Sequence, residues 1–160
     1  MIEWYPWIVL MHVVGAFGFV FAHGASAFAA FRMRSDRRPE AVSAMLGLSS
    51  LSLTVMYPSL LLLLVGGIWA AFAANLWGEL WVWLSIAVLL GVAIAMYLVG
   101  TRFYMRVRQA VGAGPSAANS PPLGADELAV LLERPQPHLL GAIGGIGLLV
   151  ILWLMVVKPG

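Results

Sequence analysis

Three histidines are the side chains of this sequence best suited to chemistry: His12, His23 and His138. The chain has no cysteine, which excludes disulfides, thiolate metal sites and cysteine nucleophiles. Each histidine belongs to an uncharged stretch, where a polar imidazole is costly in lipid and is therefore more often functional. Imidazole is a common axial ligand of haem iron, so all three are candidate haem-iron ligands and a haem is the expected cofactor. The alternative for each is a hydrogen bond to a hydroxyl or carbonyl of a neighbouring helix.

The spacing of the histidines leaves two haem sites open. On a helix, His12 and His23 lie on one face but about 16 Å apart, so they cannot bind one metal ion. His138 is expected at the opposite side of the membrane from His12 and about 8 Å in depth from His23. The first candidate site is therefore His12 alone or with Met155, which is the soft ligand expected at the same depth. The second is a bis-histidine pair of His23 and His138.

Hydroxyl side chains concentrate in the stretch that follows the first long uncharged block: Ser43, Ser49, Ser50, Ser52 and Thr54. Hydroxyls beside a histidine and nearby arginines would suit a haem whose propionates face the arginines. The alternative is that these hydroxyls form hydrogen bonds between helices. A P-loop, a nucleophile elbow and a HExxH zinc helix are absent from the sequence.

The elements that carry these residues must be membrane-spanning helices. Of the 160 residues, 62% are hydrophobic and 10% are charged, whereas soluble domains average about 45–50% and about 25%. No Asp, Glu, Lys or Arg occurs in four blocks, which are residues 4–31, 41–78, 80–101 and 135–157. A bilayer core needs about 20 apolar residues in helical form, and helices satisfy every backbone group within lipid.

Four spans, rather than five, give the better charge distribution. Eight of the nine basic residues then share one side, and only Lys158 lies on the other, as the positive-inside rule expects. The predicted fold is an all-α membrane protein, a four-helix antiparallel bundle with both termini outside, in the inner (cytoplasmic) membrane of the cell. The seven tryptophans agree, because this topology places all of them toward the outer face, where indole rings are favoured: Trp4, Trp7, Trp69, Trp77, Trp81, Trp83 and Trp153.

One transmembrane domain is expected over residues 1–160. Its helices are predicted at about residues 5–31, 43–74, 80–107 and 138–157, with a cytoplasmic linker over 109–137. Within that linker, residues 126–134 favour a short amphipathic helix that Pro135 ends. Residues 111–122 have the composition of a mobile linker. Pro58 is expected to kink the second helix because its ring removes one helical hydrogen bond.

Small residues predict where the helices pack. The first helix carries a stripe of them, which is Gly18, Ala22, Ser26 and Ala30. The last helix carries Gly141, Gly144, Gly145 and Gly147, and we expect tight packing through a face that includes Gly145. Dimerisation, or room for a flat cofactor, is the alternative use of these faces.

Three segments carry a resemblance to a known superfamily: His12-Val13-Val14-Gly15-Ala16; Met56-Tyr57-Pro58-Ser59-Leu60 followed by Gly66-Gly67; and the ending Met155-Val156-Val157-Lys158-Pro159. They resemble small four-helix membrane proteins that include HemJ-type protoporphyrinogen oxidases, the copper-resistance protein D family and uncharacterised relatives. The resemblance implies that His12 matches the haem b ligand of the oxidases. The oxidases have a different segment after that histidine and before the last helix, so the chain looks most similar to the uncharacterised branch.

Three functions follow in order of preference, and they leave open whether the chain is an enzyme. The first is a haem-b-binding membrane protein with a redox or electron-transfer role. The second is a non-catalytic membrane subunit or assembly factor of a larger complex, and the third is a porphyrinogen oxidase. The expected surroundings are the lipid bilayer, with a homo-oligomer or a larger membrane complex as candidate assemblies and no nucleic acid.

Overall fold

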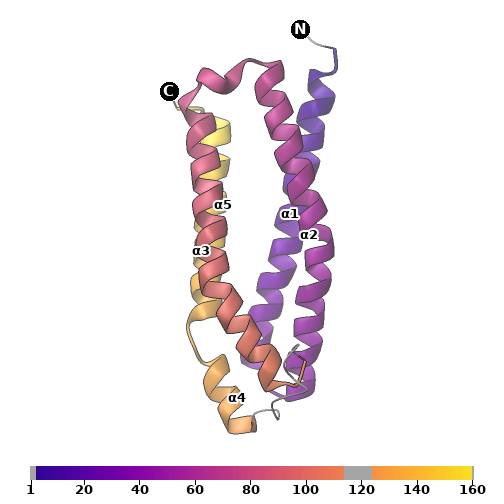
Figure 1. Ribbon diagram of the computed structural model, residues 1–160, viewed down its shortest axis with the longest axis vertical. Coiled ribbons are helices and arrows are strands. Elements are labelled where there is room, and N and C mark those ends of the chain that lie inside the picture. The colour runs from indigo at the N-terminus through magenta and orange to yellow at the C-terminus, as the bar shows by residue number, and fades with distance from the viewer. Residues whose placement is uncertain (1–2, 114–123, 160) are drawn as a thin grey trace.

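The computed structural model describes residues 3–113 and 124–159, and throughout these residues its regular structure is helical. The elements are α1 (Tyr5–Ser35), α2 (Pro39–Ala73), the 3₁₀ turn η1 (Leu76–Gly78), α3 (Leu80–Ala110), α4 (Ala125–Leu132) and α5 (Gln136–Val157). Figure 1 shows the four long helices running along one axis, with both termini at one end and α4 at the other. We call these the terminal end and the arginine end, because Arg32, Arg37, Arg108 and Arg134 lie at or beyond the helix ends near α4.

The predicted four-helix membrane bundle is confirmed. Four stretches are long and apolar enough to cross a bilayer, namely Tyr5–Ser35, Pro39–Ala73, Leu80–Ala110 and Asp126–Val157, the last of which includes α5. Between 11% and 22% of the residues in their most apolar windows are buried, so most of this apolar surface faces outward. Such a surface requires lipid around it, because a water-soluble protein rarely exposes large contiguous apolar patches.

The helices extend further at the arginine end than the hydrophobic blocks predict. The first helix continues to Ser35 and the second begins at Pro39, with the extended residue Arg38 before it. Proline is favoured in the first turn because its missing N–H would have no helical partner there. The predicted linker is shortened for the same reason, since α5 begins at Gln136 and has Pro137 in its first turn. Residues 114–123, which include most of the stretch predicted to be mobile, lie outside the described residues.

The helices associate as two pairs. Helix α1 packs along α2 and α3 packs along α5, while contacts between the two pairs are sparse and occur mainly between α1 and α5. Figure 1 shows the same arrangement, with α1 beside α2 and α3 in front of α5. Helix α2 is continuous through Pro58, and the kink expected there stays a prediction.

The main hydrophobic cluster lies at the arginine end, where α4 closes the bundle. Leu128 and Leu132 of α4 are almost completely buried, against Met33 of α1, Val42 of α2 and Val107 of α3. Asp126 and Glu127 occupy the exposed first turn of α4, where their negative charge interacts favourably with the positive end of the helix dipole. The amphipathic helix expected at residues 126–134 is therefore present, but it begins one residue earlier and ends two residues earlier, at Leu132.

The small-residue stripe of α1 packs against another helix as predicted, and that helix is α2. Ala22 and Ala30 are buried, a side chain at Gly18 would meet Ser59 of α2, and Ser26 shares a hydrogen bond of 2.8 Å with Ser49 of α2. Small residues and hydroxyl pairs are the usual contacts between helices in membranes.

The packing face predicted for the last helix is wrong in one respect. A Cβ at Gly145 would meet nothing within 4 Å, whereas Cβ atoms at Gly144 and Gly147 would collide with His23 and Val92. Gly145 follows Gly144 by one residue, which rotates it about 100° away on the helix. The buried residues of α5 recur at steps of three, four and seven, which defines the inward face: Pro137, Leu140, Gly144, Gly147 and Leu154.

Candidate functional site

The backbones of α1 and α2 approach each other closely at two glycines. A side chain at Gly15 would collide with the backbone of Leu63, and a Cβ at Gly66 would lie 2.8 Å from the backbone nitrogen of His12. Neither position can accept a side chain unless the helices move apart. Two segments that are about 50 residues apart in the chain therefore form one interface, and the first histidine lies in it.

The imidazole of His12 is held by this interface. Its Nδ1 atom lies 2.8 Å from the carbonyl oxygen of Leu63 on α2. A carbonyl can only accept, so Nδ1 carries the proton and donates. Gly67 makes room for the ring, because a Cβ there would lie 2.9 Å from Nδ1. In the neutral imidazole the other nitrogen, Nε2, keeps its lone pair, which is the state that binds a metal ion.

His23 lies between α1 and α5. Its ring stacks on Phe19 with centroids 6.0 Å apart and an interplanar angle of 7°. Its Nε2 atom lies 2.6 Å from the position that a Cβ on Gly144 would occupy. Helix α5 therefore covers Nε2 directly, and a porphyrin cannot be placed on that nitrogen without moving the helix.

His138 is exposed in the first turn of α5 and lies against the ring of Phe31, at a centroid distance of 5.2 Å. Phe31 follows His23 by eight residues on α1, which is about 12 Å along the axis. The contacts of His23 and His138 are thus at different levels of the bundle. Met155 is half-buried near the end of α5. Among the described residues no group of three His, Asp or Glu side chains could hold a metal ion.

Most of the hydrogen bonds donated by hydroxyl groups of α2 go to backbone carbonyls of the same helix. Those of Ser50, Ser52 and Thr54 donate to carbonyls three or four residues earlier in the same helix. Two hydroxyls also link helices: Ser49 pairs with Ser26 of α1, and Ser50 accepts a hydrogen bond of 2.7 Å from Arg108 of α3. The interpretation as hydrogen bonds between helices holds for these two.

Arginine side chains connect the link between α1 and α2 to the residues just before α5 through hydrogen bonds and an ion pair. Arg34 donates to the carbonyl of Arg134 at 2.7 Å, and Arg37 pairs with Glu133 at 2.9 Å. Asp36 accepts hydrogen bonds from the guanidinium of Arg38 at 2.7 and 2.9 Å. These bonds favour the ionised carboxylate and lower the pKa of Asp36 to about 2.

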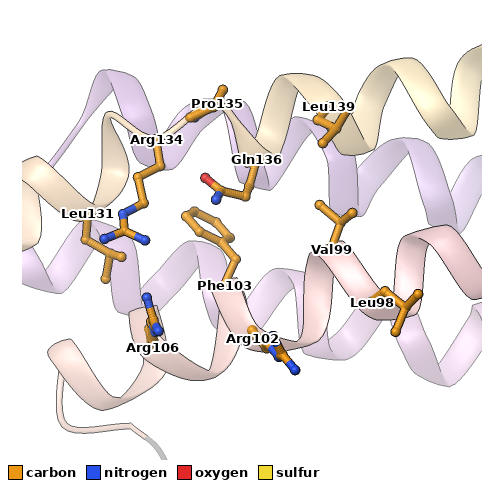
Figure 2. A pocket seen from close by; sticks show the side chains of 10 residues that line it. All are labelled: Leu98, Val99, Arg102, Phe103, Arg106, Leu131, Arg134, Pro135, Gln136 and Leu139. Carbon is orange, nitrogen blue, oxygen red and sulfur yellow. The ribbon is translucent and has the colours of Figure 1, made fainter.

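A pocket of about 340 Å³ lies between α3, the end of α4 and the first turn of α5. Figure 2 shows Arg106 and Arg134 pointing toward one another across it, while Arg102 points aside. The apolar part of its lining comes from five side chains and one proline ring: Leu98, Val99, Phe103, Leu131, Leu139 and Pro135. This site was not predicted from the sequence, although Arg102 and Arg106, four residues apart on one helix face, indicate a basic surface there.

The terminal end collects the tryptophans. Trp81 is buried and lies under the ammonium group of Lys158, which is 5.6 Å from its ring centroid. Trp69 and Trp83 are more than half exposed, so they are surface residues. The indole N–H of Trp83 donates to the carbonyl of Trp77 at 2.9 Å, and such half-polar rings suit a membrane boundary.

Comparison with known proteins gives a family for the chain. No curated protein and no solved structure matched it. The model of one protein family, described as a predicted integral membrane protein (DUF2269), matches residues 6–159, which includes all four spans and His12, His23 and His138. The chain therefore belongs to the DUF2269 family of predicted integral membrane proteins.

Proposed function

We propose that this membrane protein binds haem b through His12 and serves in electron transfer. The observation that carries the proposal is the hydrogen bond from Nδ1 of His12 to the carbonyl of Leu63. Metal-binding histidines almost always donate their second ring N–H to a carbonyl or carboxylate, which fixes the tautomer and the ring orientation. His12 has this arrangement, and Nε2 is its remaining nitrogen for iron.

The surroundings of His12 fit an iron ligand better than those of the other two histidines. Nε2 of His23 is covered by α5 at Gly144, and His138 is exposed at the arginine end. The resemblance to the HemJ-type superfamily points to His12 as well, because the segment around His12 and the segment with Gly66-Gly67 are two of its three motifs. These two motifs form one interface around the ring.

Haem b, when bound, supplies one-electron redox chemistry at its iron. The chain contributes the ligand nitrogen, and the hydrogen bond from Nδ1 to the carbonyl of Leu63 fixes the tautomer in which Nε2 has no proton. Gly66 and Gly67 allow the ring to lie flat against α2. The lipid-facing surface on both sides keeps water from this level of the bundle, which lies about 10 Å inside the end of α2.

The absorbance spectrum of the detergent-purified protein tests the proposal. A Soret band with sharp reduced α and β bands is expected for the parent chain and for His138→Ala. His12→Ala should lose the signal, and His23→Ala should keep it. Loss in both His23→Ala and His138→Ala would instead support the bis-histidine pair. Suppose the parent is purified without a Soret band and still lacks one after incubation with haemin and removal of the free haemin. That result would overturn haem binding and favour the non-catalytic subunit.

The enzymatic alternative has its own assay. If the parent chain binds haem, oxidation of protoporphyrinogen IX to the fluorescent porphyrin can be followed directly. A rate above the non-enzymatic background that is lost in His12→Ala would favour the porphyrinogen oxidase over electron transfer alone.

We infer also that the arginine end faces the cytoplasm in the inner membrane. The support is the excess of Arg over acidic residues at that end and the clustering of Trp at the other. A homo-oligomer or a larger membrane complex remains part of this proposal, since most of the apolar surface of the spans faces outward.

A further inference from the structure

The arginines of the arginine end fall into two groups. Four of them donate hydrogen bonds from their guanidinium groups, and these are Arg34, Arg37, Arg38 and Arg108. In the described part of the chain, the guanidinium groups of Arg102, Arg106 and Arg134 make no such bond and no ion pair. All three line the pocket between α3 and α5. Arg32 likewise has no such bond among the described residues and lies outside the pocket, so three of the four arginines without a protein acceptor line this one pocket.

Two of these groups face each other. Arg106 projects from α3 and Arg134 from the link between α4 and α5, and their guanidinium groups point toward one another in Figure 2. Like charges that converge repel each other, and no acidic residue lines this pocket. Both side chains are exposed, so solvent screens part of this repulsion, and an anion between them would compensate the rest. Planar guanidinium groups bind phosphate through two parallel hydrogen bonds, which makes phosphate the best matched anion.

The first turn of α5 adds to the positive field. Pro135 and Gln136 line the pocket, and α5 has no side-chain cap at its N-terminus. In the first turn of α5, Pro137 has no N–H, and the backbone N–H groups of Gln136 and His138 lack intrahelical partners. Such N–H groups carry partial positive charge and favour an anion nearby.

The pocket is also amphipathic. Leu98 and Leu139 line it and are 63% and 48% exposed, on helices that span the membrane. The arginines lie toward the ends of these helices and the leucines lie nearer the bundle centre. A ligand that fits this order has an anionic head and an apolar tail that follows the helices into the bilayer. A volume of about 340 Å³ is within the usual range of ligand pockets, about 300–1,000 Å³.

We propose that the pocket formed by Arg102, Arg106 and Arg134 binds the phosphate group of an anionic glycerophospholipid. The acyl chains lie against Leu98, Val99 and Leu139, and the phosphate lies between Arg106 and Arg134. Basic pockets between transmembrane helices on the cytoplasmic side are typical binding places for such headgroups. The bound lipid links α3 to the start of α5 and compensates the converging charges. This proposal is independent of haem binding.

The experiment measures lipid binding to the full chain in a neutral detergent by native mass spectrometry. The probes are dioleoyl-phosphatidylglycerol, dioleoyl-phosphatidylcholine and inorganic phosphate. The parent should bind phosphatidylglycerol at least about tenfold more tightly than phosphatidylcholine. Both lipids have a phosphate, but the choline cation of phosphatidylcholine offsets its charge and would lie near the arginines, whereas phosphatidylglycerol keeps a net negative charge. Inorganic phosphate at equal concentration should not displace the lipid.

A matched pair of double variants locates the site. Arg106→Gln with Arg134→Gln removes two charges from the pocket, and Arg32→Gln with Arg38→Gln removes two charges from the same end outside it. The first variant should bind phosphatidylglycerol about tenfold more weakly, and the second should bind it as the parent does. If both variants bind phosphatidylglycerol equally weakly, the proposed site in the pocket is wrong and the lipid is attracted by the overall charge of the arginine end.

Three other results would overturn the proposal. Equal affinity for the two lipids would exclude recognition of the anionic headgroup. Displacement by inorganic phosphate would indicate that the pocket binds a soluble anion. If the pocket variant fails to fold, Arg106→Lys with Arg134→Lys keeps the charge and loses the bidentate geometry. If that lysine variant keeps the parent's preference for phosphatidylglycerol, binding of the phosphate by the two guanidinium groups is excluded.

Discussion

The Nε2 atom of His23 on α1 lies 2.6 Å from the place where a Cβ on Gly144 of α5 would be. The imidazole thus fills the space that the glycine leaves, and it is one of the few contacts between the two helix pairs. A histidine that the sequence marks as a candidate ligand has a packing role in the structure. Its replacement should therefore affect the association of the helix pairs before it affects any cofactor.

A double-mutant cycle measures this contact. Gly144→Ala should lower the stability in detergent by about 1–3 kcal/mol, the usual cost of overpacking. Adding His23→Ala should recover part of that loss, because the smaller side chain removes the collision and contacting residues are not additive. Strictly additive effects in thermal unfolding would show that the two residues do not share this space.

The interface at His12 should be the least tolerant of added volume. Gly66→Ala places a Cβ 2.8 Å from the backbone of His12 and Gly67→Ala places one 2.9 Å from its ring, so each should cost about 1–3 kcal/mol. Gly145→Ala is the matched control, since a Cβ there meets nothing within 4 Å. Equal melting temperatures for Gly66→Ala and Gly145→Ala would contradict the close approach of α1 and α2.

The main hydrophobic cluster at the arginine end should contribute strongly to the stability of the protein. Leu132 of α4 is 0% exposed, and removing a buried leucine side chain costs about 2–5 kcal/mol. Leu132→Ala should therefore unfold or detach α4, which limited proteolysis near residue 124 can report. Val130→Ala is the control because Val130 is 64% exposed on the same helix, and comparable losses in both variants would refute the assigned inward face.

Asp36 should titrate at an unusually low pH. Its hydrogen bonds with Arg38 lower its pKa to about 2 from an ordinary 3.8. Because the folded-state pKa is the lower one, the stabilisation is fully present above pH 3.8 and is lost as the pH falls through 2. The carboxyl carbon shift of Asp36 should have its midpoint near 2 in the parent and near the ordinary value in Arg38→Ala. An unchanged midpoint in that variant would assign the shift to another group.

The sidedness of the bundle can be tested with reporter fusions. A fusion after Pro159 should be active only with a periplasmic reporter, and one at Ala113 only with a cytoplasmic reporter. The reason is the asymmetry of arginine between the two ends. The reverse pattern would place the arginine pocket in the outer leaflet.

The helices themselves were determined by the sequence. Four uncharged blocks of sufficient length allow only spanning helices in lipid, and the distribution of arginine and tryptophan predicts which ends lie together. The boundaries at the arginine end were predicted less well. Charged residues such as Arg32 and Arg34 can extend a helix beyond the apolar block, because only the membrane core requires apolar side chains.

The partner of each helix face was decided only by the tertiary structure. Four glycines lie within seven residues of α5, and hydropathy does not distinguish Gly144, which faces His23, from Gly145, which faces outward. The acceptor for His12 is a backbone carbonyl, and every residue has one, so no residue type could reveal Leu63. The convergence of Arg106 and Arg134 likewise depends on how α3 packs against α5. Side-chain types determine that a helix is buried in lipid, while rotation and pairing follow from shape complementarity between helices.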